Sequence, residues 1–194
     1  MSILQTVGKI DKKAESETII LGLDPGTSVM GYGLIMVKGQ KMSLIQFGVI
    51  HLSKYKNHET KLKKIFERVI SLINDYNPDE VALEAPFYGK NVQSMLKLGR
   101  AQGVAMAAAL SRELPITEYA PKKVKQSVTS NGNASKEQVA NMLITLLNIK
   151  EAPKMLDATD ALGVAVCHHF QKGAPAKSAK SWKAFINDNP GRVG

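Results

Sequence analysis

The stretch from Ile19 to Gly33 constrains the fold more than any other part of the chain, because a carboxylate ends an apolar run. Ile19 to Leu23 is apolar, Asp24 follows, and the turn residues Pro25–Ser28 come next. A short apolar run bounded by Pro and Gly is typical of a β-strand. Asp24 therefore either ends a strand that faces a site or caps the turn as an Asx turn, and both interpretations stay open here.

The remaining hydrophobic pattern predicts an α/β fold. Strand-like runs lie at about 18–24, 29–38, 42–52, 80–84 and 115–119, and helical periodicity occurs at 59–76, 92–114, 121–129, from Ser135 onward, and at 157–171. The first three strands follow one another closely, which favours an antiparallel meander. Strands that alternate with helices favour parallel pairing. We expect one mixed β-sheet with helices on both faces.

The length of 194 residues predicts one main domain, with less regular ends. Residues 1–17 have no clear periodicity and are expected to form a flexible arm, and residues 18–171 the domain. Residues 172–194 are rich in Gly, Ala, Ser, Pro and Lys and predict a mobile basic tail. No run of 18 apolar residues and no signal-peptide core occurs, which predicts no membrane span. The single cysteine, Cys167, excludes an internal disulfide and favours a reducing, cytoplasmic location.

The charge of the chain indicates the class of partner. The formal net charge is +9 and the isoelectric point is about 9.6. A basic chain of this kind favours a polyanionic partner, either nucleic acid or an anionic membrane. Because no membrane-directed segment is found, nucleic acid is the preferred partner.

Four acidic residues stand out by their positions. Asp24 and Glu84 end apolar strands, and Asp157 and Asp160 open the last predicted helix on one face. The order of elements allows these carboxylates to converge, where they would repel one another and raise each other's pKa. A divalent cation relieves that repulsion, and oxygen ligands suit Mg²⁺ or Mn²⁺. Two such ions about 4 Å apart activate water and stabilise the leaving oxygen of a phosphodiester.

Each of these acids also has a purely structural interpretation. Asp157 and Asp160 could cap the last helix, because acids in a first helical turn interact favourably with the helix dipole. Glu84 could be a strand-end charge that meets solvent. These alternatives stay open at the level of the residues.

Several residues are candidates for contacts with nucleic acid. Phe87 and Tyr88 follow Glu84 in a loop that also holds Lys90, and they could stack on unpaired bases or plug the core. Lys125 and Lys136 could contact phosphates or be solvated.

Six motifs occur in order along the chain: L-G-L-D-P-G-T-S-V-M-G-Y-G, A-L-E-A-P-F-Y-G-K-N, L-K-L-G-R-A-Q-G-V-A, V-K-Q-S-V, G-N-A-S-K-E-Q-V and D-A-T-D-A-L. Together they resemble the RuvC family of bacterial Holliday-junction resolvases. The resemblance extends from about Ile19 to Phe170.

The resemblance implies a ribonuclease-H-like fold and a homodimer that nicks two opposed strands of a four-way DNA junction with Mg²⁺, in homologous recombination and DNA repair. It also implies a branch-migration complex, RuvA and RuvB, as partner. The catalytic acids of the family fall on Asp24, Glu84, Asp157 and Asp160. Its stacking aromatic falls on Phe87, and its important lysines fall on Lys125 and Lys136.

Three other functions compete with this one. A nuclease of the same fold could act on RNA or RNA–DNA hybrids instead. The D-x-G-T motif at Asp24 also occurs in actin-like ATPases and sugar kinases, but the second phosphate loop and nucleoside pocket of those proteins are not recognisable here. A DNA-binding protein without catalysis is the third, and the presence of all four acids argues against it.

Overall fold

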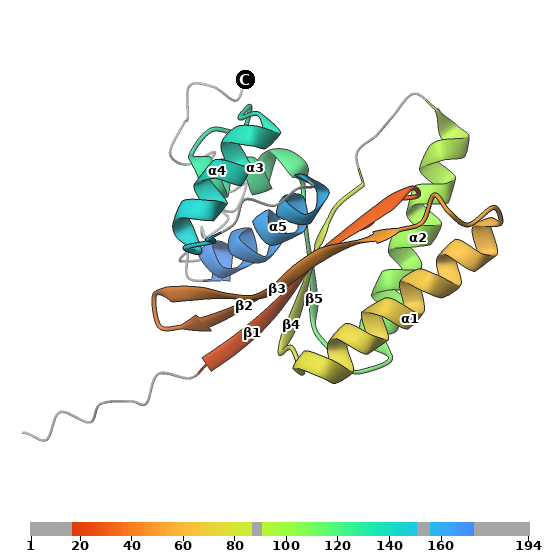
Figure 1. Cartoon of the computed structure of the whole chain (residues 1–194), viewed down its shortest axis with the longest axis horizontal. Helices are drawn as coiled ribbons and strands as arrows, with labels where there is room; N and C mark the ends of the chain where they lie inside the picture. The colour runs from red at the N-terminus through yellow and green to blue at the C-terminus, as the bar shows by residue number, and fades with distance from the viewer. Residues whose placement is uncertain (1–16, 87–90, 151–155, 173–194) are drawn as a thin grey trace, which may run out of the picture.

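The computed structural model describes residues 17–86, 91–150 and 156–172, which form one sheet with helices on either side (Figure 1). The strands are β1 (Glu17–Asp24), β2 (Val29–Lys38), β3 (Lys41–His51), β4 (Glu80–Glu84) and β5 (Ile116–Tyr119). The helices are α1 (His58–Tyr76), α2 (Val92–Leu110), α3 (Pro121–Thr129), α4 (Lys136–Leu146) and α5 (Leu156–Lys172). The order of elements agrees with the order predicted from the hydrophobic pattern.

The five strands form a mixed sheet in the order β3-β2-β1-β4-β5. β1 pairs with β2, and β2 with β3, in the antiparallel direction, while β4 is parallel to both β1 and β5. The predicted three-stranded meander with added parallel strands is confirmed. In this topology the carboxyl ends of β1, β4 and β5 lie at the same edge of the sheet.

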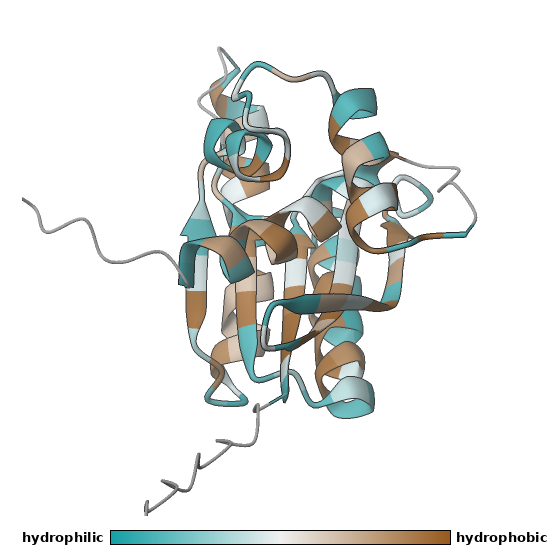
Figure 2. Cartoon of the chain, turned by 90° about the vertical axis from the view of Figure 1, so that its left-hand side faces the viewer, coloured by the Kyte–Doolittle hydropathy of each residue, from teal (hydrophilic) through white to brown (hydrophobic). Residues whose placement is uncertain are grey.

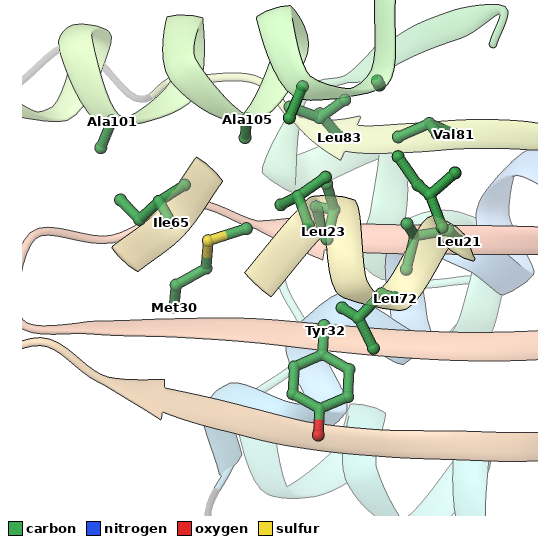
Figure 3. Packing of buried hydrophobic residues seen from close by; sticks show 14 of the residues in the cluster. Leu21, Leu23, Met30, Tyr32, Ile65, Leu72, Val81, Leu83, Ala101 and Ala105 are labelled. Atoms are coloured by element: carbon green, nitrogen blue, oxygen red, sulfur yellow. The ribbon is translucent and has the colours of Figure 1, made fainter. Parts of the chain in front are cut away.

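Helices cover both faces of the sheet, as predicted. α1 and α2 lie on one face, and α3, α4 and α5 lie on the other (Figure 1). Alternate residues of β1 serve the two sides, because Leu21 packs in the cluster beneath α1 and α2 whereas Ile20 packs beneath α3–α5. Figure 2 shows the hydrophobic residues concentrated on the central strands between the helices. Figure 3 shows the first of these clusters, where Leu21, Leu23 and Leu83 meet the helices.

The second helix is shorter than predicted. The sequence predicts helix as far as Leu114, but α2 ends at Leu110. Its last turn is closed by Ser111, and Glu113 adopts a positive φ of 58°. The reason lies in Pro115, which disfavours helical backbone at the preceding residue and forces the chain to leave the helix before β5.

Three glycines allow α5 to lie unusually close to the sheet. A Cβ atom added to Gly22 of β1 would lie 2.2 Å from the Ala161 carbonyl oxygen, and one added to Gly31 of β2 would lie 2.1 Å from that of Asp157. A Cβ atom added to Gly33 of β2 would lie 2.7 Å from Leu162 Cδ2. Any larger residue at these positions would push α5 away. The first turn of α5 is therefore held directly over the ends of β1 and β2.

The start of α4 is fixed by a capping box. The Ser135 hydroxyl accepts a hydrogen bond from the Gln138 amide, and the Gln138 side chain accepts one from the Ser135 amide. This places Lys136 in the first turn of the helix. In the part of the chain that the structure describes, no helix has the length and hydropathy needed to cross a bilayer.

Candidate active site

Asp24 and Glu84 lie beside one another at the carboxyl edge of the sheet. β1 and β4 are parallel and paired through Leu23 and Leu83, so the next residue of each strand is a carboxylate. Gly22 faces α5, and side chains two residues apart share a face. Asp24 and Glu84 therefore both face α5, and the strand-end interpretation of Asp24 is favoured over a simple turn cap.

The first two turns of α5 bring the other two acids to the same place. The burial of both strand carboxyls is accompanied by electrostatic repulsion between Asp24 and each of Glu84, Asp160 and Asp157. The Asp160 side chain is only 16% exposed, whereas that of Asp157 is 41% exposed. The structure thus brings the four predicted carboxylates, from two strands and one helix, to this edge of the sheet.

These surroundings make both strand carboxylates weak acids. Burial, followed by repulsion from Glu84 and Asp160, raises the pKa of Asp24 to about 8. Burial, followed by repulsion from Asp160, raises the pKa of Glu84 to about 7. Near neutral pH the protein therefore holds protons on carboxyls that would be ionised in water.

Two lysines counter part of this repulsion. The Lys136 ammonium donates to Asp160 Oδ2 at 2.5 Å and lies 3.9 Å from Asp157 Oδ1. Burial opposes the charge of Lys136, but the hydrogen bond and the nearby carboxylates raise its pKa overall. Lys125 of α3 also lowers the pKa of Glu84 electrostatically. In the described contacts Asp160 thus binds a side-chain cation.

The chemistry of these residues fits a divalent cation. The donors are carboxylate oxygens, which hard cations prefer, and burial together with mutual repulsion raises the pKa values of Asp24 and Glu84. Among the described residues, no three His, Cys, Asp or Glu side chains are already arranged as a metal-binding cluster. The Lys136 ammonium between Asp157 and Asp160 supplies the positive charge in this arrangement.

A buried glutamine beside the site was not predicted from the sequence. Gln102 of α2 is 6% exposed, and its amide donates to a Glu118 carboxylate oxygen and lies 3.5 Å from the Glu84 carbonyl oxygen. Together with Asp24 and Glu84 it lines a pocket of about 120 Å³ next to Leu98. The available signal was a polar residue within the alanine-rich inner face of the helix.

The structure brings six of the nine predicted site residues close to one another. The four acids and Lys136 lie together, and Lys125 acts on Glu84 from α3. Phe87, Tyr88 and Lys90 lie outside the described residues, so their contacts with nucleic acid stay predictions.

Comparison with known proteins gives one consistent family. The model of the family "Crossover junction endodeoxyribonuclease RuvC" matches residues 20–168. A protein of that name from Cytophaga hutchinsonii is 68% identical over 177 residues, which cover 91% of this chain and 88% of the relative. A second, from Christiangramia forsetii, is 64% identical over 181 residues, which cover 92% of this chain and 94% of the relative.

Solved structures agree with this result. The structure described as Thermus thermophilus RuvC in complex with Holliday junction substrate matches with a TM-score of 0.75 and 33% identity, over 80% of this chain and 94% of that chain. The mixed sheet flanked by helices is thus the ribonuclease-H-like fold that the motifs imply.

Proposed function

The chain belongs to the RuvC family of crossover junction endodeoxyribonucleases, and we propose on this basis that it resolves four-way DNA junctions in homologous recombination and DNA repair. The reaction is the metal-dependent hydrolysis of one phosphodiester in each of two opposed strands. One observation carries the proposal: the four family acids meet at one edge of the sheet, on strands and a helix that hold them rigidly.

The protein's own residues would divide the work at this edge. Asp24, Glu84, Asp157 and Asp160 would hold the cations, and their backbone positions are fixed by strand pairing and by the close approach of α5. Lys136 would be released from Asp160 when a cation enters, and its ammonium would then be free to bind a phosphate oxygen.

Mg²⁺ is the ion that we propose, with Mn²⁺ as a substitute and two ions in each site. When bound, the ions would activate the attacking water and stabilise the leaving oxygen. The hard oxygen donors support this choice of metal. Because the pKa values of Asp24 and Glu84 are raised, the ions would compete with protons for these carboxyls near neutral pH.

The decisive experiment is incubation with a mobile four-way junction and Mg²⁺, with symmetric paired nicks as the expected product. A linear duplex of the same sequence and an Asp24→Asn variant serve as controls, and both should remain uncut. Cleavage of an RNA–DNA hybrid without cleavage of the junction would overturn the proposal in favour of another nuclease of this fold. Removal of the metal by EDTA should stop cleavage and leave junction binding intact.

A homodimer accounts for two nicks, and the outer face of α2 supports one. Val92, Leu96 and Leu110 are 67%, 52% and 58% exposed. Gly99 and Gly103 lie between them with open space above. The intervals between these positions are four, three, four and seven residues, so they form one seam along the helix. We propose that a second copy of the chain packs there, which would relate two active sites by a two-fold axis.

A charge on this seam tests the dimer. Leu96→Glu should convert the protein to a monomer in light scattering and abolish paired nicking, because a buried unpaired carboxylate is costly. Phe66→Glu makes the same chemical change at a residue of α1 that is 40% exposed, and it should leave the dimer intact. A Leu96→Glu protein that stays dimeric would refute this interface.

Two further assignments complete the proposal. The cell compartment is the cytoplasm, which agrees with a single cysteine that is buried and unpaired. The partner is the branch-migration complex of RuvA and RuvB. Co-sedimentation of the protein with that complex on a four-way junction tests the partner directly.

A further inference from the structure

A basic pocket lies between the end of β3 and the middle of α1, on the face of the sheet opposite α5. Its volume is about 460 Å³. The lining residues are Val49, Ile50, His51, Lys54, Tyr55, Lys64, Glu67, Arg68 and Ser71. We refer to it as the β3–α1 pocket. None of these residues belongs to the carboxylate site.

Arg68 is fixed in place at this pocket by a buried tyrosine. Its Nη2 donates to the Tyr32 hydroxyl at 2.8 Å, and the guanidinium lies 4.8 Å from the centre of the Tyr32 ring. The ring passes over Gly48 of β3, where an added Cβ would lie 2.6 Å from the Tyr32 hydroxyl oxygen. In Figure 3 the Tyr32 hydroxyl points away from the labelled core residues. The core thus holds one cation in a defined position, so little side-chain entropy remains to be lost on binding.

The charges around the pocket are unbalanced. Lys54, Lys64 and Arg68 supply three cations, and Glu67 is the one carboxylate among the lining residues. Glu67 accepts from Lys64 at 2.7 Å and also lies 3.7 Å from Lys63. Within the described ranges, no carboxylate lies within ion-pair distance of Lys54 or Arg68. The pocket therefore has an excess of positive charge and free N–H donors.

Hydrogen bonds connect the elements that border the pocket to the turn that follows Asp24. The turn that follows Asp24 is tied to the end of β3, because the Ser28 carbonyl oxygen accepts from the amides of Leu52 and Ser53. The same turn is tied to α1, because Lys61 Nζ donates to the Thr27 carbonyl oxygen at 3.0 Å. Lys64 is one turn of α1 beyond Lys61, and Lys54 directly follows Ser53.

We propose that the β3–α1 pocket binds the phosphate backbone of a duplex arm as it leaves the cleavage site. This assignment rests on the proposed function, since it takes junction DNA as the substrate. Phosphate is the ligand that an ordered guanidinium beside two ammonium groups recognises. Contacts with phosphates position a DNA arm but carry no sequence information, so the pocket would set the direction of the arm without base specificity.

A double variant, Lys54→Gln with Arg68→Gln, tests the proposal in metal-free buffer, where binding is measured without cleavage. The slope of log K against log salt should become shallower by about 2, because two phosphate contacts are lost. Over a fourfold rise in salt, the affinity advantage of the wild type should shrink about tenfold. Lys41→Gln is the matched control, because Lys41 is exposed at the opposite end of β3. It should keep the wild-type slope.

Two further measurements identify the contact. Tyr32→Phe keeps the ring and removes the hydroxyl that holds Arg68, so its slope should fall between those of the wild type and the double variant. Stepwise shortening of the junction arms should abolish the difference between the wild type and the double variant, since a short arm no longer reaches the pocket. The thermal stability of each folded variant is measured in parallel.

The outcomes separate this inference from the proposed function. A double variant that binds long-armed junctions like Lys41→Gln refutes the pocket, even if the wild type cuts junctions as proposed. A defect that persists at every arm length also refutes it, because the residues would then act elsewhere. A wild-type protein that binds no junction refutes the proposed function itself.

Discussion

The two ends of β4 carry the same side chain in opposite electrostatic states. Glu80 and Glu84 are four residues apart, share a face of the strand, and both face α5. At the Glu80 end, His168 Nε2 lies 2.5 Å from Glu80 Oε2, and Lys172 also binds the carboxylate. At the Glu84 end, Asp160 adds repulsion. Burial alone raises the pKa of either group, but hydrogen bonds from Lys172 and His168 lower the pKa of Glu80 below its usual value.

Burial is the largest single influence on the pKa of both carboxyls, and their neighbours decide the outcome: Lys172 and His168 outweigh burial at Glu80, whereas Asp160 adds to it at Glu84. His168 and Lys172 come from the last turns of α5, whereas Asp157 and Asp160 come from its first two turns. The same helix therefore neutralises one end of β4 and adds negative charge to the other. The paired end fixes α5 against the sheet, with Tyr119 of β5 adding a 2.8 Å hydrogen bond to His168 Nδ1. We call the Glu84 end the unpaired end, because among the described contacts no ion pair reaches Glu84 itself. Its carboxyls outnumber Lys136, and a cation can satisfy this charge imbalance.

The largest expected effect is the loss of cleavage in Glu84→Gln. Junction cleavage should fall by about 10²-fold or more, because a ligand for the cations is weakened. In metal-free buffer the variant should be at least as stable as the wild type, because the substitution removes a buried carboxyl whose ionised form is repelled by Asp160. Paired kinetic and thermal measurements check both statements. Near-normal cleavage would mean that Glu84 is a solvated strand end.

The same substitution at the other end should have the opposite effect. Glu80→Gln should cost about 1.5–3 kcal/mol of unfolding free energy, because charge-assisted hydrogen bonds to His168 and Lys172 are lost. The folded Glu80→Gln protein should still cut junctions, because the described contacts of Glu80 are with His168 and Lys172 and not with the carboxylate site. Chemical denaturation gives the stability, and a cleavage assay below the unfolding midpoint gives the activity. If Glu80→Gln and Glu84→Gln lost the same unfolding free energy, the proposed difference between the two ends of β4 would be wrong.

The pH dependence of stability should also differ between the Glu84 end and the Glu80 end of β4. The folded protein keeps protons on Asp24 and Glu84 that the unfolded chain releases near pH 4, so their contribution to stability is lost as the pH rises toward about 8. Glu80 has a lowered pKa, so its contribution is lost as the pH falls instead. Metal affinity should rise by up to about tenfold per pH unit for each proton displaced. Calorimetric titration between pH 6 and 8 measures it, and a flat profile would contradict the raised pKa values.

The smallest expected effect is that of Tyr119→Phe. It removes the hydroxyl that meets His168 and should cost about 0.5–1.5 kcal/mol of stability. Metal affinity should be unchanged, because the hydroxyl is at the paired end. A change in metal affinity larger than the change in stability would show that the paired end controls the cation site directly.

The sequence predicts the unpaired end better than the paired end. Asp24 and Glu84 each end an apolar run, and parallel strands bring such ends together, so a local pattern was sufficient. The pairing of Glu80 with His168 joins residues 88 positions apart. This pairing depends on the position of α5 along β4, and side-chain packing between the two elements sets that position. No periodicity in the sequence contains that information.

Similar limits apply elsewhere in the molecule. The capping box at Ser135 is a local pattern of four residues, which a sequence alone can reveal. The contact of Gln102 with Glu118 and the position of Arg68 over Tyr32 were not predicted, because each joins two elements of the finished fold. The motifs and the strand ends were sufficient to identify the four acids as candidate site residues. The cations that surround these acids are set by tertiary packing, which the sequence pattern does not contain.

The glycines beneath α5 have a consequence for how mutations in this protein would be interpreted. A methyl group at Gly31 would overlap the Asp157 carbonyl oxygen, so it would displace the turn that carries two of the acids. In a survey of inactive variants, Gly22 and Gly31 would score like catalytic residues although they offer the substrate no functional group. These glycines contribute the space that lets α5 approach the sheet. Inactivity of a variant there would mean that the acids on α5 have moved away from those on the strands.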